Sequence, residues 1–325
     1  MVSDLERIYA PVQGDLQRLG ELLRQELATD DPFIGELVDH VLATRGKLVR
    51  PALALLSAAA AGEADEQRLW LAGTVELIHI ASLIHDDVID AADLRRGEST
   101  VNVLWGNQIA VLLGDYLFAT AFDLVSRVRH PQVSPTIAGA AVRMSQAEIL
   151  ATKHGGEPHE DEATYFTIID GKTAALFSAA CRAGALIAGA AAPVVNALTE
   201  FGRQWGLSFQ ITDDALDLTG SPDALGKPVG SDIDTGKVTL PVIAAIRRAS
   251  EPDRLRLQAL LRAGAGDGAL SELRALVDRW GGVRYALDVA RSLADGARAA
   301  LEVLPASPAC ASLLDLTQFV VVRAR

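Results

Sequence analysis

Apolar residues recur at helical spacing along most of the chain, and short polar breaks separate the apolar runs. Typical runs are LAGTVELIHIASLIHDDVID, over residues 71–90, and the stretch over 109–122. No segment alternates at period two for long enough to predict a sheet. Residues that end helices, namely Gly, Pro, Asp and Ser, gather in the breaks at 30–32, 91–100, 152–161, 220–236 and 264–268. Since no linker or repeat interrupts this pattern, it predicts ten to twelve helices in one all-α bundle, a single domain over residues 1–325.

Composition supports a helical fold and disfavours one class of function. Half of the 325 residues are hydrophobic, and aromatic residues make up only 5%. Ala and Leu, which dominate, have high helix propensities. A formal net charge of −12 does not suit a nucleic-acid-binding protein, which normally carries a basic surface. An anionic substrate would need local basic residues or metal ions.

Cysteine usage and the apolar stretches indicate a cytoplasmic protein. The chain has two cysteines, Cys181 and Cys310, too few for a disulfide framework. Its first residues include early acids and no apolar signal core. The most apolar stretch, residues 174–195, contains Arg182 and is mostly Ala and Gly. It therefore predicts a buried helix rather than a membrane span, and we expect no transmembrane segment.

Two aspartate clusters follow apolar helical runs. Asp86, Asp87 and Asp90 end the first run, and Asp213, Asp214 and Asp217 repeat the spacing in FQITDDALD. Carboxylates at i and i+4 share a helix face and repel each other, and helix C-terminal ends disfavour anions. One such cluster is commonly a solvated helix end. Two clusters of the same design indicate oxygen ligands for Mg²⁺, which binds through a few carboxylates together with substrate phosphates.

Basic residues surround both clusters. Arg95 and Arg96 follow the first cluster, and GKLVRP upstream places Lys47 and Arg50 at a predicted helix N-terminus, a favourable anion site. His79 lies two turns before Asp86 on the same face. GKPVGSDIDTGKVTLP follows the second cluster, and IIDGKTAALF contains a further lysine. Each cation alone is typical of a solvated surface, so only their joint placement indicates phosphate binding.

With these residues in place, the chain resembles the trans-polyprenyl diphosphate synthases, a family that includes farnesyl, geranylgeranyl and longer-chain synthases. Six segments carry the resemblance in the family's order: GKLVRP, HDDVID followed by LRRG, GDYLFA, DGKTAALF, FQITDDALD and GKPVGSDIDTGKVTLP. They cover most of the chain from Lys47 onward. Arg45 and Leu48 depart from the family pattern, where Gly and a basic residue are common.

The resemblance implies an antiparallel helix bundle around a deep cavity, usually dimeric, and a role for each site residue. The isopentenyl diphosphate site would consist of Lys47, Arg50, His79 and Arg96. The Mg²⁺ ligands would be Asp86 and Asp90, with Asp213 for a further ion and Asp217 in support. The donors to the allylic diphosphate would be Arg95, Lys172, Lys227 and Lys237, while Thr173 and Gln210 would line the cation-forming region. The catalytic residues would be Asp86, Asp90, Arg95, Lys172 and Asp213.

The implied reaction condenses isopentenyl diphosphate with an allylic diphosphate. The allylic diphosphate ionises, the double bond of isopentenyl diphosphate attacks the cation, and loss of a proton gives a product five carbons longer. Ala81 and Ser82, five and four residues before Asp86, are small, whereas short-chain members carry bulky aromatics there. We therefore expect a product beyond twenty carbons, a quinone side-chain precursor, with Phe118 and Phe122 as candidate deeper floor residues or ordinary core residues.

Several alternatives stay open from the sequence. Within the family, the chain could instead be a geranylgeranyl or farnesyl diphosphate synthase. A class I terpene cyclase shares a helical fold and an acid cluster, but it lacks the isopentenyl site that Lys47, Arg50 and His79 suggest. A non-catalytic subunit of a heteromeric synthase would be expected to lose one acid motif, and this chain keeps both.

Overall fold

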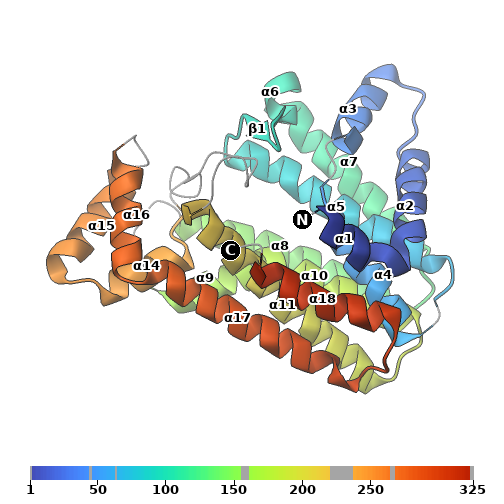
Figure 1. Cartoon of the computed structure of the whole chain (residues 1–325). Coiled ribbons are helices and arrows are strands. Elements are labelled where there is room, and N and C mark those ends of the chain that lie inside the picture. The colour runs from blue at the N-terminus through green and yellow to red at the C-terminus, as the bar shows by residue number, and fades with distance from the viewer. Residues whose placement is uncertain are drawn as a thin grey trace. The chain divides into compact units, whose positions relative to one another are not determined.

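The computed structural model describes residues 2–43, 46–62, 64–154, 161–219, 237–263 and 268–322 (Figure 1). The chain divides into two compact units. The first contains residues 1–141, 176–202 and 300–316, and the second contains 142–175, 203–299 and 317–325. The single-domain organisation stays a prediction, and each unit is described by itself. The Gly-rich loop at 220–236, including Lys227, lies outside the described residues, as does Arg45.

Helices form nearly all of the described chain, which confirms the all-α prediction. The helices that lie wholly in the first unit are α1 Val2–Tyr9, α2 Gln13–Glu26, α3 Pro32–Ala43, α4 Val49–Ala61, α5 Gln67–Ile89, α6 Val101–Trp105 and α7 Asn107–Ser126, with the short 3₁₀ turns η1 Ala10–Val12 and η3 Leu301–Val303. Those wholly in the second unit are α9 Glu162–Ile169, the π-helical turn η2 Asp170–Ala174, α14 Leu240–Arg248, α15 Glu251–Ala263 and α16 Ala269–Arg279. Residues of both units belong to α8 Val133–His154, α10 Ala175–Ile187, α11 Ala192–Thr219, α17 Gly282–Ala300 and α18 Pro308–Val322.

The described residues form sixteen α-helices, more than the ten to twelve expected. Some apolar runs that read as one helix are interrupted by short breaks. Pro11 lies in the 3₁₀ turn between α1 and α2, and Gly106 separates α6 from α7 with φ 86°, a left-handed value that favours glycine. Breaks of one to three residues hardly change the hydrophobic period, so the pattern alone merges the helices on either side.

A short hairpin is the second difference from the sequence prediction. β1 Leu94–Arg95 pairs antiparallel with β2 Glu98–Ser99 inside the predicted break at 91–100. The two turn residues, Arg96 and Gly97, have φ values of 55° and 84°. Positive φ at both central residues is the signature of a tight type I′ hairpin turn. Two-residue strands are too short to show a period, so no sheet pattern can be recognised in the sequence there.

The core of the first unit forms around α5, which packs mainly against α7 and α4. Leu71, Val75 and Leu77 of α5 are fully buried. The backbone of α10 approaches α4 closely, because a Cβ at Gly184 would lie 2.4 Å from the carbonyl oxygen of Ala54. The apolar stretch at 174–195 is a largely buried helix as predicted, but it ends at Ile187, just before Gly189 at φ 69°.

Two apolar clusters build the core of the second unit. The first joins α11, α14, α15 and α16, and its buried members include Val242, Leu257 and Leu273. The second joins α9, η2, α11, α14 and α17 through residues such as Ile169 and Ile211. This second cluster places the π-helical turn η2 beside α11, where the second aspartate cluster lies.

By length and composition alone, α7 is the one helix within the described ranges that could cross a membrane, and 39% of its apolar window is buried. Core helices of soluble proteins meet the same criterion, so this is weak evidence. The absence of a transmembrane segment stays a prediction. Cys181 and Cys310 are both free thiols.

Candidate active site

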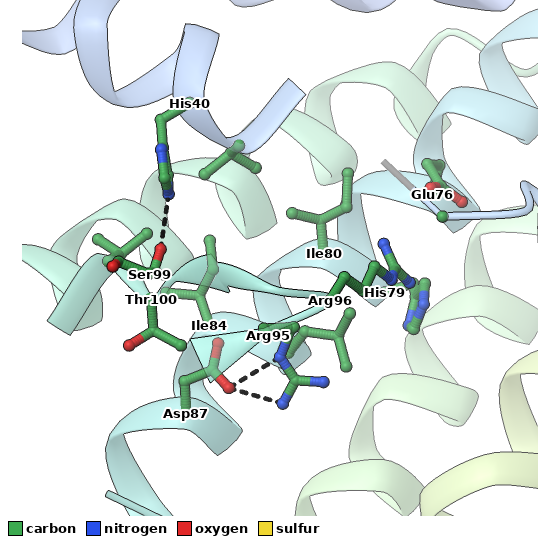
Figure 2. A pocket seen from close by; sticks show the side chains of 14 residues that line it. His40, Glu76, His79, Ile80, Ile84, Asp87, Arg95, Arg96, Ser99 and Thr100 are labelled. Carbon is green, nitrogen blue, oxygen red and sulfur yellow. Dashed lines mark hydrogen bonds and ion pairs between the residues drawn. The ribbon is translucent and has the colours of Figure 1, made fainter. Parts of the chain in front are cut away.

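The carboxylates at the end of α5 divide between two environments. Asp86 and Asp90, one turn apart, are half-buried, and the N–H of Asp90 donates to the carbonyl oxygen of Asp86 at 2.8 Å. Asp87 is buried and faces the hairpin, where its Oδ1 accepts from Nε of Arg95 at 2.8 Å and from Nη2 at 2.6 Å (Figure 2). Burial raises the pKa of Asp87, and the Arg95 charge partly offsets that rise. The spacing i, i+4 therefore correctly separates Asp86 and Asp90 from Asp87.

The hairpin carries Arg95 and Arg96 into a small pocket of about 50 Å³ that α3 and α5 also line. Figure 2 shows Arg95, Arg96, His79 and Glu76 around this pocket. Gly46 touches the Arg96 guanidinium so closely that a Cβ there would lie 2.4 Å from Nη2. Burial lowers the pKa of Arg96, but a guanidinium stays charged in proteins.

His79 is held as a neutral acceptor. Nη1 of Arg50, in the first turn of α4, lies 3.0 Å from Nε2 of His79. The Arg50 guanidinium also lies 4.3 Å above the ring of Phe177, a cation–π contact. Burial, and then the nearby charges of Arg50, Arg96 and Arg95, hold the pKa of His79 well below its usual range. Since Arg can only donate, Nε2 accepts and Nδ1 carries the proton.

Three residues of this region were missed by sequence reasoning: Tyr9, Gly46 and Glu76. The Tyr9 hydroxyl donates to the carbonyl oxygen of Lys47 at 3.1 Å, which attaches the loop to α1. Glu76 is 3% exposed and lines the pocket one turn before His79. Residues three apart on a helix are neighbours, so the sequence could have placed Glu76 beside His79. Tyr9 lies far away in sequence and gave none.

The loop before α4 has the geometry that the sequence predicted. Lys47 is exposed, and Arg50 lies in the first turn of α4, which begins at Val49. Leu48 caps the helix with φ 50° and ψ 34°, an uncommon left-handed conformation for a side chain of its size. Strained backbone of this kind concentrates at ligand-binding sites.

In the second unit, a buried hydrogen-bond chain brings Thr173 and Gln210 together. The Thr173 hydroxyl donates to Oε1 of Gln210 at 2.7 Å, and Nε2 of Gln210 donates to Oδ1 of Asp214 at 2.8 Å. The Tyr165 hydroxyl donates to Oδ2 of Asp214 at 2.6 Å. The amide of Gln210 is thus oriented from both sides. The resemblance placed Thr173 and Gln210 in one region. It counted Asp214 only as a member of the second aspartate cluster, and it gave Tyr165 no role.

The remaining predicted residues of the second unit lie as follows. Lys172 forms an ion pair with Glu148 of α8. Asp213 is half-buried on α11, and Asp217, one turn later, is 1% exposed. Lys237, just before α14, is half-buried. The two aspartate clusters belong to different units, so their facing across a shared cavity stays a prediction.

The four residues tied to product length all lie in the first unit. Ala81 is fully buried, and the Ser82 hydroxyl donates to the carbonyl oxygen of His79 at 2.8 Å. Phe118 stacks between His85 and Phe122, with ring centroids 6.0 and 6.4 Å away, and Phe122 is 43% exposed. In a single chain, Phe122 therefore lies at the surface. The tunnel role of these residues stays a prediction.

The aspartates fit a metal that is bound together with phosphate. Within the described ranges, no three or more His, Cys, Asp and Glu side chains gather closely enough to enclose an ion. Asp86 with Asp90, and Asp213 with Asp217, each supply two carboxylates at i, i+4. Mg²⁺ is commonly bound by one or two carboxylates while waters and substrate phosphates complete its octahedron. The residues present thus suit a metal–diphosphate complex rather than a closed protein cage.

Together, the fold and the site define a helical enzyme with paired carboxylates and clustered guanidinium groups for phosphorylated substrates. The family model "polyprenyl synthetase" matches residues 31–277, and the chain belongs to this family. It is 41% identical to a short chain isoprenyl diphosphate synthase of Methanothermobacter thermautotrophicus, with 99% of this chain and 98% of the relative covered.

Two solved structures match nearly the whole chain. One is a decaprenyl diphosphate synthase from Rhodobacter capsulatus, with TM-score 0.93, 37% identity and 99% of both chains covered. The other is a polyprenyl synthase from Caulobacter crescentus complexed with calcium and isoprenyl diphosphate, with TM-score 0.92, 34% identity, and 98% of this chain and 97% of that chain covered. The resemblance stated from the motifs is confirmed.

Proposed function

We propose that this chain is a Mg²⁺-dependent trans-polyprenyl diphosphate synthase that condenses isopentenyl diphosphate with an allylic diphosphate. The observation that carries the proposal is the first unit's combination of two carboxylates suited to a metal, Asp86 and Asp90, with a pocket lined by His79, Arg95 and Arg96. Arg50 adjoins this pocket through its hydrogen bond to His79. A carboxylate pair alone suits many metal sites. The adjoining pocket would bind a second phosphorylated substrate. A condensation requires two such substrates, whereas a cyclisation requires one.

Isopentenyl diphosphate would bind at Lys47, Arg50, His79 and Arg96. The two arginines supply fork-shaped donors for phosphate oxygens, and Arg50 is preset by its contacts with His79 and Phe177. The related Caulobacter crescentus structure contains isoprenyl diphosphate together with calcium. Both features support a phosphorylated isoprenoid as the ligand of this chain.

The allylic diphosphate would be held by Arg95, Lys172, Lys227 and Lys237, and Mg²⁺ by Asp86, Asp90, Asp213 and Asp217. When bound, the metal would supply positive charge that stabilises the departing diphosphate. Thr173 and Gln210 place a hydroxyl and an oriented amide near Lys172. Their oxygen atoms can face the allylic cation, and Gln210 is fixed in one orientation by Asp214.

The reaction would proceed by ionisation, condensation and elimination. The carbon–oxygen bond to the diphosphate breaks, the double bond of isopentenyl diphosphate forms the new carbon–carbon bond, and a proton passes to the released diphosphate. Holding the two substrates side by side supplies a large part of the rate acceleration. Arg95 and Lys172 would act on the leaving diphosphate, which makes them catalytic residues in this proposal.

Small residues before the first aspartate cluster support a product longer than twenty carbons. Ala81 and Ser82 leave room where a bulky side chain would stop the growing chain, and burying each CH₂ is worth about 0.8 kcal/mol. The decaprenyl synthase of Rhodobacter capsulatus is a similar chain. A geranylgeranyl or other short-chain product is the second candidate, because the Methanothermobacter relative, 41% identical, is a short-chain synthase.

The protein is further proposed to be a cytoplasmic homodimer. On α7, Val111, Leu112 and Phe122 are 42%, 55% and 43% exposed. Val111 and Phe122, about three turns apart, share one face of α7, and exposed apolar side chains on one face are typical of an association surface. A second copy is the proposed occupant, and analytical ultracentrifugation of the purified chain should give twice the monomer mass.

Product analysis tests the function. The purified chain is incubated with farnesyl and isopentenyl diphosphates and Mg²⁺, and the products are separated by mass. Linear prenyl diphosphates beyond C20 support the proposal, whereas a C20 product supports the short-chain candidate. Cyclised hydrocarbon would indicate a terpene cyclase. Product formed only after a partner protein is added would indicate a subunit of a heteromeric synthase.

A further inference from the structure

The π-helical turn η2 carries two of the proposed site residues, Lys172 and Thr173. It joins α9 to α10 and begins at Asp170. A π-helical turn inside an α-helix disturbs the regular hydrogen-bond pattern, and it is frequently found at functional sites. A turn of this kind needs contacts from outside to hold its register, because its own backbone pattern is less favourable than an α-helix.

Asp170 supplies such contacts with both neighbouring helices. Its Oδ1 accepts from Nε of Arg203 on α11 at 2.7 Å, and its Oδ2 accepts from Nη2 of Arg143 on α8. The carboxylate itself is mostly shielded, with 20% of its side chain exposed. One side chain therefore ties the first residue of η2 to two different helices. All three residues line a cavity of about 320 Å³.

The next residue fixes the distance between η2 and α8. A Cβ at Gly171 would lie 2.6 Å from the Cβ of Ala147 and 3.0 Å from the carbonyl oxygen of Arg143. The turn is therefore in direct contact with the α8 backbone. Further along it, Lys172 pairs with Glu148 of α8, and Thr173 donates to Gln210 of α11. Side-chain contacts thus connect η2 to both helices, with Lys172 on α8 and Thr173 on α11.

We propose that Asp170 is a positioning residue for the condensation, because it locks η2 in the register that presents Lys172 and Thr173 to the allylic substrate. The inference rests on the proposed function. Asp170 does not itself touch substrate in this proposal. Its partners Arg143 and Arg203 are 46% and 44% exposed, and ion pairs with exposed partners contribute little to stability. The Asp170 pairs are therefore expected to affect geometry more than stability.

The test compares Asp170→Asn with a matched control, Glu272→Gln. Glu272 also accepts from an exposed arginine, Arg256, in the same unit, and it has no part in the proposed site. Asp170→Asn should lower kcat roughly 10- to 100-fold, since a misplacement of about 1 Å can cost 100-fold. The KM for isopentenyl diphosphate and the melting temperature should stay unchanged. The control should change neither kinetic parameter.

Amide hydrogen exchange gives a readout that does not depend on activity. Peptides that cover residues 170–174 should exchange faster in Asp170→Asn than in the wild-type chain, and not in the control. In an Arg143→Gln, Arg203→Gln background, Asp170→Asn should cause no further loss of kcat. Unchanged exchange, or faster exchange with normal kcat, overturns the inference. A wild-type chain that makes no prenyl product overturns the proposed function instead.

Discussion

Gly46 should control the affinity for isopentenyl diphosphate through the position of Arg96. In Gly46→Ala, the new Cβ would lie 2.4 Å from Nη2 and 2.7 Å from Cζ of Arg96. Atoms cannot approach so closely, so the guanidinium must move. The backbone of Gly46 is outside the left-handed region, because its φ does not lie between +20° and +160°. Alanine is therefore compatible with the local chain, and the main consequence is displacement of the Arg96 side chain.

The size of the effect follows from the hydrogen bonds that Arg96 would lose. A hydrogen bond to a charged group is worth about 1.5–3 kcal/mol, and a tenfold change in affinity corresponds to about 1.4 kcal/mol. Loss of one such bond to the diphosphate should therefore raise the KM for isopentenyl diphosphate about 10- to 150-fold. The KM for the allylic substrate should change little, because Arg96 is assigned to the other substrate.

The assay is steady-state kinetics with labelled isopentenyl diphosphate at saturating farnesyl diphosphate. Gly35→Ala is the matched control, because Gly35 lies within α3 and a Cβ there meets nothing within 4 Å. It should leave both KM values unchanged and stabilise the helix by up to about 1 kcal/mol. A folded Gly46→Ala protein with the wild-type KM for isopentenyl diphosphate would refute the assignment of Arg96.

Three further predictions address the metal, the product and the neutral histidine. Asp86→Asn should abolish turnover and leave the melting temperature unchanged. Near-normal activity with Mg²⁺ would refute the metal role. Ala81→Phe should shorten the product seen by mass analysis, and an unchanged length would reject the tunnel assignment. The pKa of His79 lies below its unfolded value, so stability is lost as pH falls below about 6.5, by up to about 1.4 kcal/mol per pH unit. In urea unfolding at pH 7 and pH 5.5, His79→Gln should lose less free energy of unfolding between the two pH values than the wild-type chain. An equal loss in both chains would contradict the buried neutral state.

Helix content and the separation of the aspartates could be predicted because both depend on local spacing. The apolar runs repeat at the helical period, and Asp86 and Asp90 share a face for the same reason. Asp87, one residue after Asp86, points elsewhere and pairs with Arg95. This ion pair could not be predicted from the sequence. Arg95 lies in a hairpin whose strands have only two residues each, and strands of that length have no recognisable pattern.

Contacts between distant segments were the part that the sequence could not provide. Tyr9 reaches the Lys47 carbonyl from 38 residues away, and Asp170 reaches Arg143 and Arg203 on two other helices. None of these pairs has a fixed spacing, since tertiary packing alone brings them together. The family motifs gave the residues assigned to substrate and metal. They left out the side chains that hold those residues in place.

The first unit's pocket shows how an acidic chain can attract a diphosphate. Arg95 and Arg96 line it together with the acidic residues Asp87 and Glu76, so the formal charges of these four side chains sum to zero. His79 adds none, because its pKa is held well below its usual range by burial and by the neighbouring arginines. The positive excess must then come from Arg50, whose guanidinium stays charged in proteins, and from Lys47 at the loop. It follows that His79 should contribute no change in the KM for isopentenyl diphosphate between about pH 6.5 and 8, and a change over this range that disappears in His79→Gln would contradict its neutral state.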